Sequence, residues 1–188
     1  MCYIGYMSDE NLIEKKIDSR EVYNGRLLHV FNDRVLLPNG KEAGRDLIRH
    51  VGAVCVIPIL EDGRVIIEHQ FRYPINEVLI EIPAGKLDSK SEDHLEACKR
   101  ELREETGYEA DEWIDIGPLY PTAAYSDEVI NAYIARNLRK GERDLDDDEF
   151  INIELVPLEE LVELVMEGKI PDAKSQIAIL KAARFLGL

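Results

Sequence analysis

One helical turn that is dense in carboxylates constrains this 188-residue chain more than any other feature. Glu101, Glu104 and Glu105 stand at positions i, i+3 and i+4, so a helix with about 3.6 residues per turn gathers their side chains over one face. A solvated helix would pair glutamate with lysine four residues later, whereas Glu101 and Glu105 are like charges at that spacing and repel each other. The pattern therefore predicts a helix that binds a cation.

The local sequence also predicts where this helix begins and ends. Ser91 or Asp93 can cap its start, and Gly107 stands where a helix commonly ends in a left-handed residue. We therefore expect a helix from about residue 93 to residue 106. An apolar stripe beside the carboxylates, at helical spacing, is formed by Leu95, Cys98 and Leu102.

These residues resemble the signature of the Nudix hydrolases, which is a glycine, five residues, a glutamate, seven residues and then REUxEExGU, with U apolar. Residues 100–108, RELREETGY, match its second half in register, and Glu92 stands at the expected distance before Arg100. Six residues instead of five separate Gly85 from Glu92, so the loop is one residue longer than the pattern. A loop absorbs such an insertion more easily than a helix does. Tyr108 stands where an aliphatic residue is commoner.

The remaining pattern predicts strands, then the helix, then strands, then two helices, which is an α+β fold with a mixed sheet between helical layers. The resemblance implies the Nudix α/β/α sandwich, preceded by antiparallel N-terminal strands. We expect residues 1–45 to form a dimerising strand extension and residues 46–188 to form the Nudix hydrolase domain. Hairpins are predicted over residues 20–37, through Asn24-Gly25, and over residues 51–73, the latter at the centre of the sheet.

Charge and composition narrow the class of partner. The formal net charge of -15 argues against a protein that grips a nucleic acid backbone, although it leaves short RNA ends open. No apolar run approaches the length of a membrane span. Cys55 and Cys98 are predicted as small core residues, because the three cysteines form no CxxC pair and no even disulfide framework. The N-terminus shows neither the basic start nor the apolar stretch of a signal peptide, which predicts a cytoplasmic protein.

The segments that flank the acidic helix resemble the ADP-ribose pyrophosphatase branch of the family, from about residue 21 to the C-terminus. One departure lies in residues 122–124, Thr-Ala-Ala, where that branch usually carries Ser-Pro-Gly. This departure leaves the sugar open, so GDP-mannose or several nucleoside diphosphate sugars stay possible substrates. The segments that carry the resemblance are HQFRYP (69–74), LIEIPAGKLD (79–88), SDE (126–128), DDDEFINI (146–153) and GKIPDAKS (168–175).

The resemblance implies a metal-dependent reaction with a defined set of ligands. Mg²⁺, which prefers oxygen ligands, would be bound by Glu101 and Glu105, with Mn²⁺ as a possible substitute. Glu104 would assist with another ion or a water, and the backbone carbonyl of Ala84 would supply a further oxygen. Arg100 is expected to hold a glutamate in place rather than to touch the substrate.

Substrate-binding and proton-transfer roles are predicted for residues on the flanking segments. Arg72 is the best candidate for binding phosphate, since a guanidinium matches phosphate geometry, and Arg45 is a weaker candidate of the same kind. The alternative for Arg72 is a surface arginine at a strand end. The resemblance implies that the general base is Asp147, Asp148 or Glu149, of which Glu149 is preferred. The alternative is that these three residues form a solvated acidic turn without a catalytic role. Glu128 is predicted to bind substrate and is the rival candidate for the general base.

Related enzymes exchange N-terminal strands in a dimer, so a homodimer is expected. Tyr3, Tyr6, Tyr23 and Phe31 could form part of that interface, stack on the base or belong to the core. The main hypothesis is a magnesium-dependent enzyme that splits ADP-ribose, or a similar nucleoside diphosphate sugar, into a nucleoside monophosphate and a sugar phosphate. The alternatives are a hydrolase of RNA caps or dinucleoside polyphosphates, and a module that binds a nucleotide sugar without cleaving it.

Overall fold

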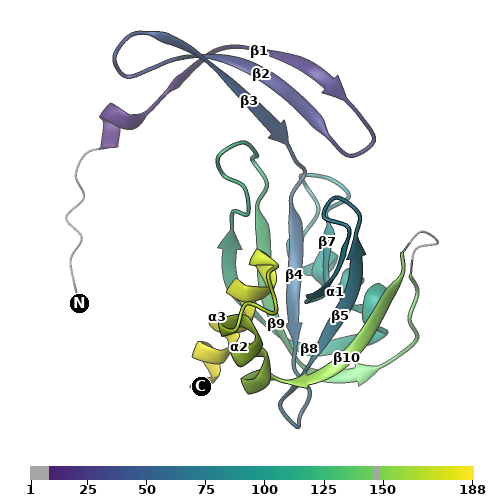
Figure 1. Ribbon diagram of the computed structural model, residues 1–188. Coiled ribbons are helices and arrows are strands. Elements are labelled where there is room, and N and C mark those ends of the chain that lie inside the picture. The colour runs from purple at the N-terminus through teal and green to yellow at the C-terminus, as the bar shows by residue number, and fades with distance from the viewer. Residues whose placement is uncertain (1–8, 146–148) are drawn as a thin grey trace. The chain divides into compact units, whose positions relative to one another are not determined.

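The computed structural model of this chain describes residues 9–145 and 149–188. These residues form two compact units, and most of their strands and helices are labelled in Figure 1. One unit contains the described residues up to His50 together with Thr122–Glu128, and the other contains the described residues of Val51–Pro121 and Val129–Leu188. Tyr3 and Tyr6 lie outside the described residues.

The first unit is built on an antiparallel sheet in the order β1-β2-β3. The predicted hairpin at Asn24-Gly25 is confirmed, because the Gly25 amide donates to the Leu28 carbonyl at 2.9 Å and closes the turn between the first two strands. The loop of residues 122–128 joins the end of the third strand, where the Ile48 amide donates to the Tyr125 carbonyl at 2.7 Å. The elements are η1 (Asp9–Leu12), β1 (Lys15–Asn24), β2 (His29–Leu36) and β3 (Glu42–Arg49).

This three-stranded sheet has little apolar core of its own. Every residue of β1 is exposed, and among the described residues of the unit Val35 is the one buried apolar side chain. A small sheet needs a packed apolar face, or cover from another element, for stability. Exposed apolar residues on or next to the first two strands are Leu12, Ile13, Ile17, Val22, Tyr23, Leu27, Leu28 and Leu36.

The second unit contains two sheets and three helices, which confirms the predicted α+β fold. One sheet has the order β7-β4-β9-β8 and the other has the order β10-β5-β6. The first is mixed, because β4 pairs parallel with β9 and antiparallel with β7. The strands are β4 (Ala53–Pro58), β5 (Arg64–Arg72), β6 (Glu77–Glu81), β7 (Ala84–Lys86), β8 (Tyr108–Leu119), β9 (Ile130–Lys140) and β10 (Ile151–Pro157), and the helices are α1 (His94–Thr106), α2 (Leu158–Met166) and α3 (Ala173–Leu186).

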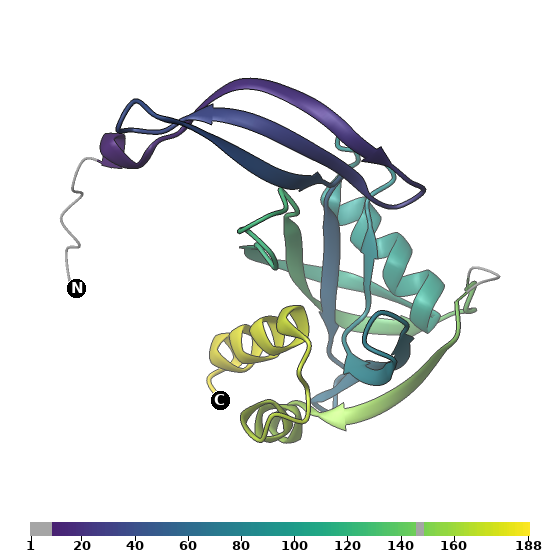
Figure 2. The same ribbon diagram turned by 45° about the horizontal axis from the view of Figure 1, so that its top comes forward.

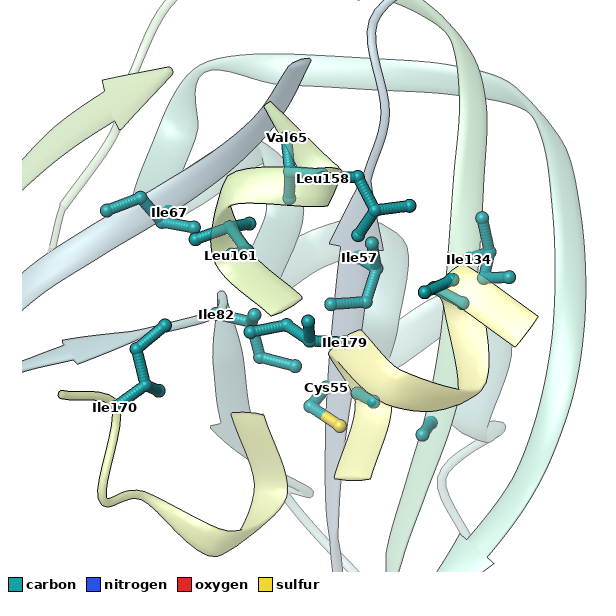
Figure 3. Close-up of a cluster of buried hydrophobic side chains, with 14 of the residues drawn as sticks. Cys55, Ile57, Val65, Ile67, Ile82, Ile134, Leu158, Leu161, Ile170 and Ile179 are labelled. Atoms are coloured by element: carbon teal, nitrogen blue, oxygen red, sulfur yellow. The ribbon is translucent and has the colours of Figure 1, made fainter. Parts of the chain in front are cut away.

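The helices lie on opposite sides of the four-stranded sheet, with α1 on one side and α2 and α3 on the other (Figure 2). Alternate residues of a strand point to opposite faces. Val54 and Val56 of β4 therefore belong to the cluster around α1, whereas Cys55 and Ile57 belong to the cluster that contains α3 (Figure 3). This second cluster also takes Val65 and Ile67 from β5, Leu158 and Leu161 from α2, and Ile179 from α3.

The predicted hairpin over residues 51–73 is wrong. The strands on either side of the turn at residues 61–63 share one isolated bridge, between Ile59 and Val65, and then enter different sheets. β4 lies between β7 and β9, and β5 lies between β10 and β6. Each strand is therefore interior to its own sheet, and the two sheets enclose an apolar cluster between them and the C-terminal helices.

The structure also bears on the predictions about the cysteines and about membrane spans. Cys55 and Cys98 are buried core residues, as predicted, and the Cys98 thiol donates to the Cys55 carbonyl at 3.7 Å. Within residues 9–145 and 149–188, none of the helices has the length and apolar character needed to cross a membrane.

Candidate active site

The acidic helix α1 has the ends that its sequence predicts. Asp93 is the N-cap, and its carboxylate accepts hydrogen bonds from the Leu95 and Glu96 amides at 3.0 Å each. Gly107 ends the helix in the left-handed conformation, with φ of 75°. These local contacts fix the helix register, so that Glu101 and Glu105 lie on its buried side, at 9% and 3% exposure.

The backbone of β7 lies directly against these two glutamates. The Ala84 amide donates to Glu105 Oε2 at 2.9 Å. A Cβ atom on Gly85 would stand 2.2 Å from either carboxylate oxygen of Glu101, which is closer than real Cβ atoms approach. β7 is itself held by antiparallel pairing with β4, in which Ala84 is opposite Cys55. The glycine of the motif is therefore what lets the Glu101 carboxylate reach the strand.

Arg100 contacts three glutamates around this cluster. Its Nη1 donates to Glu101 Oε1 at 2.7 Å and to Glu104 Oε2 at 3.3 Å, while its Nη2 donates to Glu92 Oε1 at 3.3 Å. The other oxygen of Glu92 accepts the Asp88 amide at 2.6 Å. The loop with the additional residue is thus closed by a glutamate that is also bound to Arg100.

A fourth carboxylate of the site, Glu68, is absent from the residues singled out in the sequence. It lies on β5, opposite Glu81 of β6, and is 2% exposed. Its Oε1 is buried and accepts no hydrogen bond within the described residues. The sequence does carry a signal for Glu68, which directly follows the apolar run Val65-Ile66-Ile67. A glutamate in such a place is expected to be buried, and a buried carboxylate needs a partner.

Burial and mutual repulsion make this cluster costly to ionise. Burial raises the pKa of Glu101 to about 7, against the opposing effect of Arg100. Burial also raises the pKa of Glu105, and the charges of Glu68 and Glu101 raise it further. The pKa of Glu68 is raised by burial as well. A divalent cation would remove both penalties, so these oxygen donors fit a hard divalent metal ion.

The glutamates are not prearranged as a complete set of metal ligands. No group of three or more histidine, cysteine, aspartate or glutamate side chains within residues 9–145 and 149–188 is already placed to hold an ion. Arg100 binds Glu101 Oε1 instead. A cation would therefore compete with Arg100 for Glu101.

Arg72 lies in a second ionic group beside the cluster. Its Nε and Nη2 donate to the two oxygens of Glu81, at 2.7 Å each. Lys174 also binds Glu81 Oε2 and donates to Asp172 Oδ2 at 3.1 Å. The charge of Glu105 raises the pKa of Arg72, though less than the hydrogen bond from Arg72 to Glu81 does, so the two groups are electrostatic neighbours. Lys174 belongs to the segment GKIPDAKS, in which no sequence pattern distinguishes it from its neighbours.

The candidate bases are only partly described. The charge of Glu149 contributes to the raised pKa values of Glu68, Glu101 and Glu105, so this carboxylate is within electrostatic range of the cluster. Asp147 and Asp148 lie outside the described residues. Glu128, the rival base, belongs to the unit with the three-stranded sheet, where it is 3.7 Å from His50 Nδ1.

Arg45 also belongs to that unit. Its Nη1 donates to the Gly44 carbonyl at 2.8 Å, and its Nη2 binds Glu14. The structure thus brings Ala84, Arg72, Arg100 and the glutamates of α1 together in one unit, while Arg45 and Glu128 lie in the other.

Comparison with known proteins adds independent information. The family model described as NUDIX domain matches residues 49–178, and the model described as nucleoside diphosphate sugar hydrolase N-terminal domain matches residues 14–48. An ADP-ribose pyrophosphatase of Bacillus subtilis is 37% identical over 172 residues, which cover 90% of this chain and 92% of that protein. A methanol dehydrogenase activator of Bacillus methanolicus is 38% identical over 168 residues, covering 88% of this chain and 90% of the relative.

The fold has a close counterpart among solved structures. A crystal structure of an ADP compounds hydrolase superposes with a TM-score of 0.83 and covers 92% of this chain and 94% of its own. The two sequences are 22% identical, so this likeness establishes the fold.

Proposed function

Because this chain belongs to the Nudix hydrolase family, we propose that it hydrolyses the pyrophosphate of ADP-ribose, or of a related nucleoside diphosphate sugar, to a nucleoside monophosphate and a sugar phosphate. The observation that carries the proposal is the pair of buried, like-charged glutamates, Glu101 and Glu105, held against the backbone of β7. The match of residues 14–48 to the N-terminal domain of nucleoside diphosphate sugar hydrolases supports the substrate class.

Nudix hydrolases in general use divalent metal ions, and we propose Mg²⁺ here, with Mn²⁺ as a substitute. Glu101 and Glu105 would bind it directly, with Glu104 and the Ala84 carbonyl oxygen as further donors. When bound, such a cation neutralises the charge of the pyrophosphate and polarises the phosphoryl group that water attacks. Arg100 holds Glu101 and Glu104 through its Nη1 and so positions these carboxylates.

Arg72 is proposed to bind a phosphate oxygen of the substrate. Its Nε and Nη2 are occupied by Glu81, whereas its Nη1 has no acceptor within the described residues. A guanidinium fixed along one edge in this way presents its remaining N–H groups in a defined direction. Glu149 is proposed as the general base that accepts a proton from the attacking water, since its charge acts on all three buried glutamates of the cluster.

The three-stranded unit is proposed to form a homodimer. Its β1 is exposed over its whole length and carries apolar side chains, which a second copy of the chain would cover. Arg45 and Glu128 of this unit are proposed to bind substrate. On this proposal residues 1–45 are the dimerising extension of a Nudix domain at 46–188.

The experiment that tests this function is a turnover panel of nucleoside diphosphate sugars, with Mg²⁺ and with Mn²⁺, in which both products are identified. ADP-ribose is expected to yield AMP and ribose 5-phosphate. GDP-mannose is the second candidate, because Thr122-Ala123-Ala124 departs from the segment usual in the ADP-ribose branch. Preferred turnover of capped RNA or dinucleoside polyphosphates, or tight binding of ADP-ribose with no products, would contradict the proposal.

A further inference from the structure

The carboxylate of Glu81 joins two cations that come from distant parts of the chain. Arg72 binds it through two hydrogen bonds of 2.7 Å, and Lys174 binds the same Oε2 that accepts from Arg72 Nη2. The side chains of Glu81 and Lys174 are only 3% and 11% exposed. Burial opposes the ionisation of Glu81, but Arg72 and Lys174 outweigh it and lower the pKa of this carboxyl.

Lys174 is itself held by the start of α3. Asp172, the N-cap of this helix, accepts from Lys174 Nζ at 3.1 Å and from the Ser175 amide at 2.9 Å. Ser175 Oγ in turn accepts the Ile82 amide at 3.0 Å, which ties the helix to the residue that follows Glu81. Ile82 and Ile170, which border this group in the sequence, lie in the buried apolar cluster (Figure 3). These contacts hold the Lys174 ammonium in a defined position.

A gain in folding stability does not explain the ion network of Arg72, Glu81 and Lys174. A buried ion network loses solvation, and apolar side chains of similar shape often stabilise a protein as well or better. What the network does supply is a fixed orientation. Two hydrogen bonds set the plane of the Arg72 guanidinium, and Lys174 restrains the carboxylate that accepts them.

We propose that Lys174 is a positioning residue for substrate binding: through Glu81 it fixes the guanidinium of Arg72, whose Nη1 binds the phosphate of the nucleotide sugar. This inference rests on the proposed function of Arg72. On this proposal, Lys174 of the segment GKIPDAKS raises the affinity for the substrate without touching it.

The kinetic test compares Lys174→Met with Lys174→Arg. Methionine keeps much of the apolar stem and removes the charge, so KM for ADP-ribose is expected to rise about tenfold while kcat changes less than about threefold. Arginine keeps the charge and is expected to restore most of the affinity. Lys181→Met, on the same helix but bound to the Ile116 carbonyl, is the matched control and should behave like the wild type. Lys174→Gln replaces the methionine variant if the latter does not fold by circular dichroism.

A double-mutant cycle separates positioning from direct contact. If Lys174 acts through Arg72, then adding Lys174→Met to Arg72→Ala should reduce kcat/KM no further than Arg72→Ala alone. Losses that multiply in the double variant would show that Lys174 acts independently and would overturn the proposal.

A spectroscopic test needs no turnover and so distinguishes failure of this proposal from failure of the proposed function. The Nε–Hε resonance of Arg72, identified by its loss in Arg72→Lys, should exchange slowly with water in the wild type. In Lys174→Met it should shift and exchange faster, and it should stay unchanged in Lys181→Met. An Arg72 resonance unaffected by Lys174→Met would refute positioning, whatever substrate the enzyme hydrolyses.

Discussion

A Cβ atom on Gly85 would stand 1.9 Å from Cδ of Glu101, although the two residues belong to different elements, β7 and α1. The close approach lets a carboxylate of the helix lie against the backbone of the strand whose Ala84 amide binds Glu105. The glycine and the glutamate of the motif therefore depend on each other sterically, and this relationship leads to the first prediction.

Gly85→Ala should displace Glu101 and reduce kcat/KM by about 10²-fold or more, because a misplaced ligand lowers metal affinity and misaligns the reacting groups. Turnover and Mn²⁺ binding, followed by electron paramagnetic resonance, measure the two effects. Gly141→Ala is the matched control, since its Cβ would meet the Gly107 carbonyl at an ordinary 3.4 Å. Normal metal binding by the Gly85 variant would show that Glu101 is not a ligand.

Glu105→Gln should abolish nearly all turnover, with a loss of about 10³-fold or more, while the fold is retained. The amide cannot replace a charged ligand, yet it has nearly the same shape within the buried cluster. Glu96→Gln, an exposed position on the same helix paired with Lys99, should leave the rate unchanged. Full activity in the Glu105 variant would show that Glu105 is not a required metal ligand.

Glu68→Gln should raise the melting temperature of the metal-free protein and weaken Mn²⁺ binding. The substitution removes a buried carboxylate whose Oε1 has no hydrogen-bond partner in the described part of the chain, and it reduces repulsion with Glu105. Thermal unfolding and calorimetric titration with Mn²⁺ measure both changes. Glu154→Gln, an exposed neighbour on β10, serves as the control. Unchanged Mn²⁺ affinity would place Glu68 outside the metal site.

Ile17→Asp should convert the proposed dimer to a monomer, because it replaces an exposed apolar side chain of β1 with a charged one. Light scattering coupled to size-exclusion chromatography measures the mass directly. Lys16→Gln, at the adjacent position, should remain dimeric. A wild-type protein that is already monomeric would contradict the proposed role of this sheet.

Local features of the fold could be predicted from the sequence, whereas strand partners could not. The ends of α1 depend on Asp93 and Gly107, whose capping roles involve residues close in sequence. The pairing of β4 with β9 joins Ala53 to Ile130, and no local pattern specifies it. For this reason the short turn at residues 61–63 suggested a hairpin, while the two strands enter separate sheets.

The candidate site divides in the same way. Glu101, Glu104, Glu105 and Arg100 could be found because they share one helical turn and match a known motif. Glu68 and Lys174 reach the site from β5 and α3, so their roles depend on tertiary packing. A charged residue next to a run of apolar ones was the available signal for Glu68, and it indicates burial without naming the partner.

The most direct test of the account is the reaction of purified protein with ADP-ribose, with Mg²⁺ present and after its removal by a chelator. We predict equimolar AMP and ribose 5-phosphate with Mg²⁺, loss of both products with the chelator, and recovery when Mg²⁺ or Mn²⁺ is added back. Product formation that continues undiminished in the chelator, or a complete absence of products from every nucleoside diphosphate sugar with either metal, would contradict it.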